Sequence, residues 1–82
     1  MENSVINEFV DVGAVFGKKC IKPKWFIWNK KKYLITEITY TWADKEGETK
    51  IIHFAVTDGS TLFELSLNKK TLEWCLEKTS LE

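Results

Sequence analysis

One histidine, one glutamate and one cysteine form the clearest candidate for a catalytic or metal-binding group in this sequence. His53 is the only histidine among the 82 residues, and a predicted hairpin places it opposite Glu64 and near Cys75. A zinc site needs three or four ligands at characteristic spacing. A nucleophilic cysteine needs an orienting group and an oxyanion hole in addition to a histidine. The second cysteine, Cys20, stands alone in a predicted loop, so we interpret His53 and Glu64 as a cross-strand ion pair.

A cluster of acids marks the tip of another predicted hairpin. Asp44, Glu46 and Glu48 alternate around a predicted three-residue loop at 45–47. Paired carboxylates can bind calcium or transfer protons, but so short a loop supplies too few rigid oxygens for a calcium site. We interpret the cluster as a solvated turn. The sequence thus predicts a protein that is not an enzyme and holds no metal or cofactor.

Lysines interleaved with aromatic residues form the candidate binding site. Its members are Lys22, Lys24, Phe26, Trp28, Lys30, Lys31, Lys32 and Tyr33. Proteins that bind single-stranded nucleic acid combine cations that follow the backbone with rings on which bases stack. The alternative is that the rings pack as a second small core while the lysines keep a sheet edge from aggregating. The chain contains no arginine, whose planar fork grips phosphate and reads guanine better than lysine does.

Composition limits the other classes of function. Net charge is zero, yet residues 12–36 carry seven lysines and no acid. Hydrophobic residues make up 44% of the chain, too many for a disordered tail. No apolar run approaches the ~20 residues of a membrane span, and the start lacks the pattern of a signal peptide. We therefore expect no membrane association, a cytoplasmic location and two free thiols.

The elements that position these residues are predicted to be strands. Aromatic and β-branched residues flank the turn at 29–32, which pairs Trp28 with Tyr33. Further turns are predicted at 45–47, at Asp58-Gly59 and at 68–71. The resulting registers pair Tyr40 with Ile52, Ile38 with Phe54, Phe54 with Phe63, Ile52 with Leu65, His53 with Glu64, Leu67 with Leu72, Leu65 with Trp74 and Phe63 with Leu76.

These registers place one set of apolar residues on a common face, which we predict as the core. It consists of Trp25, Ile27, Leu34, Ile38, Tyr40, Trp42, Ile52, Phe54, Val56, Phe63, Leu65, Leu67, Leu72, Trp74 and Leu76. A second apolar face remains, with Phe26, Trp28, Tyr33 and Ile35. Because that surface is too large to leave wet, we expect an interaction module that binds another protein or a second copy of itself through this face or a sheet edge. Binding of single-stranded nucleic acid is the alternative.

The predicted fold is all-β: an antiparallel meander of five to six strands curled into a small SH3-like barrel. An N-terminal strand at about 9–16 closes it; the alternative is two layers with an N-terminal helix, since Val5, Phe9, Val12 and Phe16 also fit a helical stripe. A single β domain is expected over residues 1–80. The closing Leu81-Glu82 is typical of a junction with a purification tag, so we leave it out of the predicted fold.

A motif in the central hairpin resembles a known family. It reads Pro23-x-x-Phe26-x-Trp28-x(4)-Tyr33-x-Ile35-x-x-Ile38-x(3)-Trp42, followed by an Asp-Gly turn, Phe63-Glu64-Leu65 and Trp74-x-Leu76. It is similar to a family of small uncharacterised bacterial proteins that carry Pro-x-x-Phe-x-Trp-Arg-Gly-Arg-x-Tyr-x-Val. The resemblance covers roughly residues 8–78, and Asn29-Lys30-Lys31 replaces Arg-Gly-Arg. Some members resemble segments attached to or encoded near Y-family DNA polymerases, and the resemblance implies no known activity.

Overall fold

The chain folds into strands joined by turns. The computed structural model describes residues 3–81. Its strands are β1 (Asn3–Phe16), β2 (Ile21–Trp28), β3 (Lys31–Leu34), β4 (Glu37–Glu46), β5 (Thr49–Thr57), β6 (Thr61–Asn68) and β7 (Trp74–Leu81). This confirms the all-β class and the N-terminal strand, so the helical alternative is wrong. No helix in the described part of the chain is long and apolar enough to cross a membrane.

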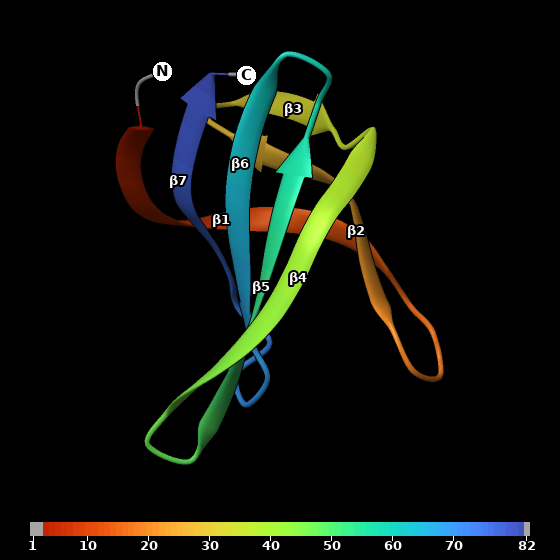
Figure 1. Cartoon of the computed structure of the whole chain (residues 1–82), viewed down its shortest axis with the longest axis vertical. Coiled ribbons are helices and arrows are strands. Elements are labelled where there is room, and N and C mark those ends of the chain that lie inside the picture. Colours follow the sequence, from red (N-terminus) through yellow and green to blue (C-terminus); the bar gives the residue numbers. More distant parts are fainter. Residues whose placement is uncertain (1–2, 82) are drawn as a thin grey trace.

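All neighbouring strands are antiparallel in one sheet of order β3-β2-β1-β7-β6-β5-β4. β1 holds the two halves together, because its first part pairs with β7 and its second part, from Asp11, pairs with β2. In Figure 1, β5 to β7 run close to vertical and β4 slants across the view, whereas β1 passes behind them nearly horizontally. The sheet therefore bends sharply along β1 and folds over its own inner face.

The predicted closure into an SH3-like barrel is wrong. β3 and β4 lie at opposite ends of the strand order and do not pair with each other. The connection between them instead turns a corner: Ile35 N donates to Lys24 O at 2.9 Å, and Thr36 N donates to Thr57 O at 2.9 Å. The corner also splits the single strand predicted between the turns at 29–32 and 45–47 into β3 and β4, which gives seven strands in the described chain rather than five to six.

The core lies inside the bend. Its buried members are Phe26, Phe54, Val56, Phe63, Leu65, Leu67, Trp74 and Leu76, with Trp28, Tyr33, Ile35, Ile38 and Ile52 packed against them. The predicted core is thus correct for β5, β6 and β7. It is wrong for β2 and β3, where the face with Phe26 points inward and the face with Ile27 and Leu34 is exposed. The alternation of inward and outward side chains along β3 is interrupted at the corner formed by Ile35 and Thr36.

The turn between β2 and β3 shows why the first predicted register is wrong. Asn29 and Lys30 adopt φ values of 53° and 63°, so they form the two-residue turn. Asparagine tolerates this left-handed conformation better than most residues. Trp28 therefore pairs with Lys31, and Tyr33 pairs with Phe26 rather than with Trp28. A shift of two residues leaves Phe26, Trp28 and Tyr33 together on one face, as predicted.

Between β4 and β5 the error reverses the faces. The turn is at 47–48, with Gly47 at φ 61°, and Glu46 pairs with Thr49. Tyr40 therefore pairs with Ala55 rather than with Ile52, a shift of three residues that turns its side chain to the other face. A bulge between Ile38 and Tyr40 takes up one residue, so Ile38 pairs with Val56 and points inward as predicted. Tyr40 and Trp42 consequently lie on the outer face and not in the predicted core.

The last two hairpins have longer loops than predicted, which shifts their registers by two residues. Phe54 pairs with Leu65 rather than with Phe63, and Leu67 pairs with Trp74 rather than with Leu72. Leu72 lies in the loop at φ 63° and is exposed, so its predicted place in the core is wrong. β7 runs to Leu81, one of the two residues that we had left out of the fold, and the other, Glu82, lies outside the described residues.

The β5–β6 loop shows why Asp58-Gly59 is not a two-residue turn. The Asp58 carboxylate accepts bonds from Ser60 N at 3.0 Å and from Thr61 N at 2.9 Å. Burial alone raises the pKa of Asp58, but these bonds outweigh it and lower the pKa below its ordinary value. The side chain thus organises a wider loop, in which Thr57 pairs with Leu62.

Candidate functional site

The aromatic residues of the predicted binding site belong to the core. Phe26 is fully buried, and its ring stacks on that of Tyr33 with centroids 5.0 Å apart. Phe63 packs edge-on against both rings. Trp28 also turns inward, and its Nε1 is buried without a hydrogen-bond partner. These rings therefore pack as core, the alternative that we had set beside the stacking surface.

The lysines of the predicted site are spread along one hairpin. Lys30, Lys31 and Lys32 are exposed at its tip, where Lys32 Nζ lies 4.7 Å from the centroid of the Trp25 ring. Lys31 Nζ lies 5.2 Å from the centroid of Tyr33. Lys24 is exposed further along β2, and Lys22 lies near its opposite end. The structure thus does not gather these five cations into one site.

The outer face of the sheet carries a row of side chains across five strands. Consecutive strand partners are Phe9, Cys75, Ser66, His53 and Trp42. The His53 ring, 14% exposed, lies parallel to that of Trp42 with centroids 5.0 Å apart. Its partner directly across is Ser66, the consequence of the two-residue shift between β5 and β6.

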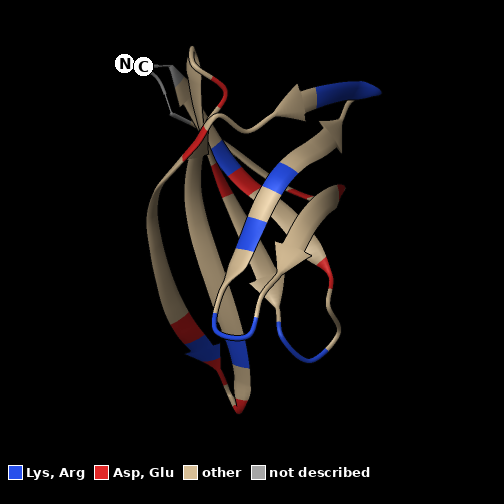
Figure 2. Cartoon of the chain, turned by 90° about the vertical axis from the view of Figure 1, so that its right-hand side faces the viewer, with Lys and Arg blue, Asp and Glu red and all other residues tan. Residues whose placement is uncertain are grey.

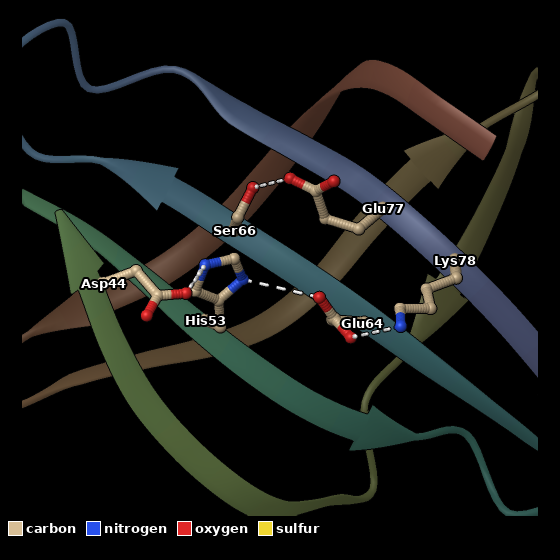
Figure 3. Close-up of polar contacts among 6 residues, drawn as sticks. All are labelled: Asp44, His53, Glu64, Ser66, Glu77 and Lys78. Atoms are coloured by element: carbon tan, nitrogen blue, oxygen red, sulfur yellow. Dashed lines mark hydrogen bonds and ion pairs between the residues drawn. The ribbon is translucent and has the colours of Figure 1, made fainter. Parts of the chain in front are cut away.

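Two carboxylates hold the His53 ring (Figure 3). Nε2 lies 3.3 Å from Asp44 Oδ2, and Nδ1 lies 3.4 Å from Glu64 Oε2. Glu64 thus lies beside His53 as predicted, although it reaches the ring diagonally and makes no hydrogen bond with Nδ1. Lys78 Nζ lies 3.7 Å from the other oxygen of Glu64. Asp44 is therefore more than part of a solvated turn, while Glu46 and Glu48 remain exposed beside the β4–β5 turn.

This arrangement is suited to structure more than to catalysis. A histidine that acts as general base must present a nitrogen to the substrate, whereas both nitrogens of His53 face carboxylates of the protein. Ser66 is almost fully buried and donates its hydroxyl to Glu77 at 2.6 Å. Among residues 3–81 no group of three or more histidine, cysteine or acidic side chains could hold a metal ion.

Cys75, beside Ser66 in the row, has a thiol of low reactivity. Burial and the neighbouring Glu77 carboxylate raise its pKa to about 11. At pH 8 such a group is ionised in about one molecule in a thousand, and the thiolate is the reactive form. We expect an aromatic disulfide reagent at pH 8 to modify the exposed Cys20 quickly and Cys75 slowly. The Cys20→Ser variant should lose the fast phase; a fast phase that persists in it would contradict this environment for Cys75.

The first surface able to bind a partner is the free edge of β4. This strand is ten residues long and, among the strands of the described part of the chain, pairs only with β5. Charged residues occupy its two ends, but residues 39–43 (Thr-Tyr-Thr-Trp-Ala) carry no charge. Tyr40, within this stretch, is 67% exposed. The opposite edge, β3, is only four residues long and begins with two lysines.

The second surface is a cleft at the place where the sheet fails to close. It has a volume of about 680 Å³ and lies between the β1–β2 connection and the inner face of β4 and β5. Ile38, Ile52 and Phe54 form its apolar floor. Its cations are Lys18, Lys19, Lys22, Lys50 and Lys69, and no acid among residues 3–81 lines it. In Figure 2 two loops in the lower half of the molecule are blue, while the lowest turn is red.

Sequence reasoning found only part of this cleft. The excess of lysine in residues 12–36 indicated a basic region, and Lys22 belongs to the predicted site. Lys50 and Lys69 come from distant segments, joined where Lys69 N donates to Lys50 O at 3.0 Å. Finding them required correct registers for β4, β5 and β6, which the turn patterns did not provide.

Comparisons with known proteins give no further identification. Neither the models of protein families, nor curated proteins, nor solved structures match this chain. The resemblance to the small bacterial family therefore stays a prediction that rests on the hairpin motif, and the chain is assigned here only as an all-β, seven-stranded antiparallel domain.

Proposed function

We propose that this protein is a non-enzymatic interaction module that binds an extended segment of another protein along the edge of β4. The observation that supports this most directly is the uncharged stretch 39–43 on a long strand whose outer edge is unpaired in the described sheet. Such an edge presents free N–H and C=O groups that a further strand can pair with. The added strand supplies backbone bonds, and its side chains supply specificity.

The two edges of the sheet differ in a way that supports this proposal. Proteins protect edges by shortening them, by placing lysines on them and by inserting bulges. β3 has the first two of these devices. β4 has a bulge between Ile38 and Tyr40, but its register with β5 is regular from Tyr40 to Glu46. That regular part is the segment to which a partner strand could pair.

The chemistry of the outer face also supports a binding role. His53 is held between Asp44 and Glu64, and the raised pKa of Cys75 keeps its thiol protonated near neutral pH. Neither group is set up to act on a substrate. The polar row fits a cross-strand network that stabilises the sheet.

Binding of single-stranded nucleic acid remains the alternative proposal. The observation that favours it is the collection of lysines around the cleft. Against it stands the position of Phe26 and Tyr33 in the core, because sequence-tolerant binding needs rings on which bases can stack. A second copy of the chain is also a candidate partner for the β4 edge.

A displayed library of random peptides tests the proposal. We expect the protein to select extended, proline-free peptides that shift the amide signals of β4. Alternate amides of a strand point to the same neighbour. A peptide N-methylated at every second residue should thus lose binding when the methyl groups replace the amide hydrogens that face β4. It should keep binding when they replace those of the alternate residues.

Three results would count against β4 pairing. One is that no peptide is selected. Another is that the two peptides N-methylated at alternate residues bind equally well. The third is self-association in sedimentation experiments that peptide does not displace, which would make a second copy the occupant of the edge.

A further inference from the structure

We infer that the partner segment is acidic, with apolar side chains at alternate positions, and that it lies over the lysine-lined cleft beside β4. This inference rests on the proposed function and adds the chemistry of the partner. The link is that Ile38 and Thr41 belong to the edge strand and also line the cleft. A strand added to β4 therefore directs every second side chain toward the cleft.

The floor of the cleft specifies apolar side chains. Ile38 and Ile52 are half-buried there, and Phe54 below them is 2% exposed. Because the sheet is not closed, no strand of the described chain covers them on this side. Valine or leucine side chains entering from an added strand would remove this surface from water, which is the main source of affinity at such contacts.

The cations specify the charge of the partner. Five lysines approach the cleft from the β1–β2 connection, from the start of β2, from β5 and from the β6–β7 turn. An adjoining depression adds Lys70, with Glu48 as its one acid. Without a partner these like charges repel one another. Lysine side chains are long and flexible enough to reach carboxylates on either side of a bound strand.

Other anionic ligands fit these observations less well. A nucleic acid needs several exposed rings on which its bases can stack. Two described rings line the cleft: Phe54 is buried, and only Phe16 is exposed. A single acyl chain has one headgroup, whereas these lysines surround the cleft on several segments. Only a polypeptide can use the free backbone edge of β4 that borders the cleft.

A pair of designed peptides tests the inference. The first alternates glutamate and valine over ten residues, the length of β4, and its matched control alternates lysine and valine. We expect amide shifts at Ile38, Thr41 and Ile52 and in the β1–β2 connection with the acidic peptide only. Charges at this surface are screened by salt, so raising salt from about 50 to 500 mM should weaken binding roughly tenfold.

Charge-reversal variants of the protein provide a second test of the inference. The variant Lys50→Glu with Lys69→Glu should weaken binding of the acidic peptide by at least about tenfold. The control Lys24→Glu with Lys30→Glu changes the net charge equally but lies outside the cleft, and it should bind as the wild type does. Circular dichroism verifies that both variants are folded.

The outcomes separate this inference from the proposed function. If library peptides pair with β4 while the acidic peptide binds no better than its lysine control, the edge is the site and the inferred chemistry is wrong. If neither class binds, the proposed function fails as well. Binding of a thymidine oligonucleotide at the same lysines, without peptide binding, would overturn both in favour of nucleic acid.

Discussion

Phe26→Ala is expected to lower the free energy of unfolding by about 3–5 kcal/mol, the range for removing a buried phenylalanine ring. The side chain is fully buried and touches two other rings, with centroids 5.0 Å from Tyr33 and 4.9 Å from Phe63. It joins the β2–β3 hairpin to β6, so its loss opens a cavity between the two halves of the bent sheet. Urea unfolding followed by tryptophan fluorescence measures the change.

The matched control is the next residue, Ile27. Its side chain is 39% exposed on the outer face, so Ile27→Ala should cost about 1 kcal/mol or less. A small domain has little stability to spare, so Phe26→Ala could unfold it entirely. Phe26→Leu then serves as a milder variant that keeps most of the volume. Equal losses for Ile27→Ala and the Phe26 variants would contradict the inward face of β2.

This pair of variants also shows where the sequence was informative and where it was not. Turn residues and alternation predicted the order of the hairpins and the inward face of β5, β6 and β7. They failed at Ile35 and Thr36, because two apolar or β-branched residues in an extended segment look like uninterrupted strand. The corner depends on backbone bonds to Lys24 O and Thr57 O, which are contacts distant in sequence.

Turn length was the second source of error. Left-handed conformations at Asn29, Lys30 and Leu72 set the positions of two turns, and lysine and leucine give little sequence signal for them. The Asp58 side chain widened a loop that an Asp-Gly pair normally keeps short. Shifts by two residues kept together the side chains predicted to share a face, whereas the shift of three residues at the β4–β5 turn moved Tyr40 and Trp42 to the opposite face.

The candidate site suffered most from these errors. The rings that we predicted to stack on bases lie on the face of β2 and β3 that points inward, so they belong to the core. The cleft depends on three separate segments meeting, and on the sheet remaining open between β3 and β4. Local patterns carry no information about closure, which is decided by how far the whole sheet bends. The charge excess in residues 12–36 was the one signal that survived.

Gly13→Ala is expected to destabilise the protein by about 1–3 kcal/mol, although alanine normally stabilises a strand relative to glycine. Gly13 pairs with Trp25 across β1 and β2, and the indole ring lies directly over it. A Cβ atom at this position would sit 2.1 Å from Trp25 Cε2 and 2.3 Å from Nε1. The ring must therefore move away and lose its contact with the strand below.

The test is a double-mutant cycle with Trp25→Ala, since a contact between two residues appears as non-additivity. Once the ring is removed, Gly13→Ala should be neutral or should stabilise by up to about 1 kcal/mol. In the single variant, the Trp25 emission should shift toward that of a solvent-exposed indole as the ring leaves Gly13. Equal effects of Gly13→Ala with and without Trp25 would show that the ring does not rest on the glycine.

Lys32, whose Nζ lies over the same ring, provides an independent check. Its signals should move with the ring in Gly13→Ala and lose the ring-current shift in Trp25→Ala.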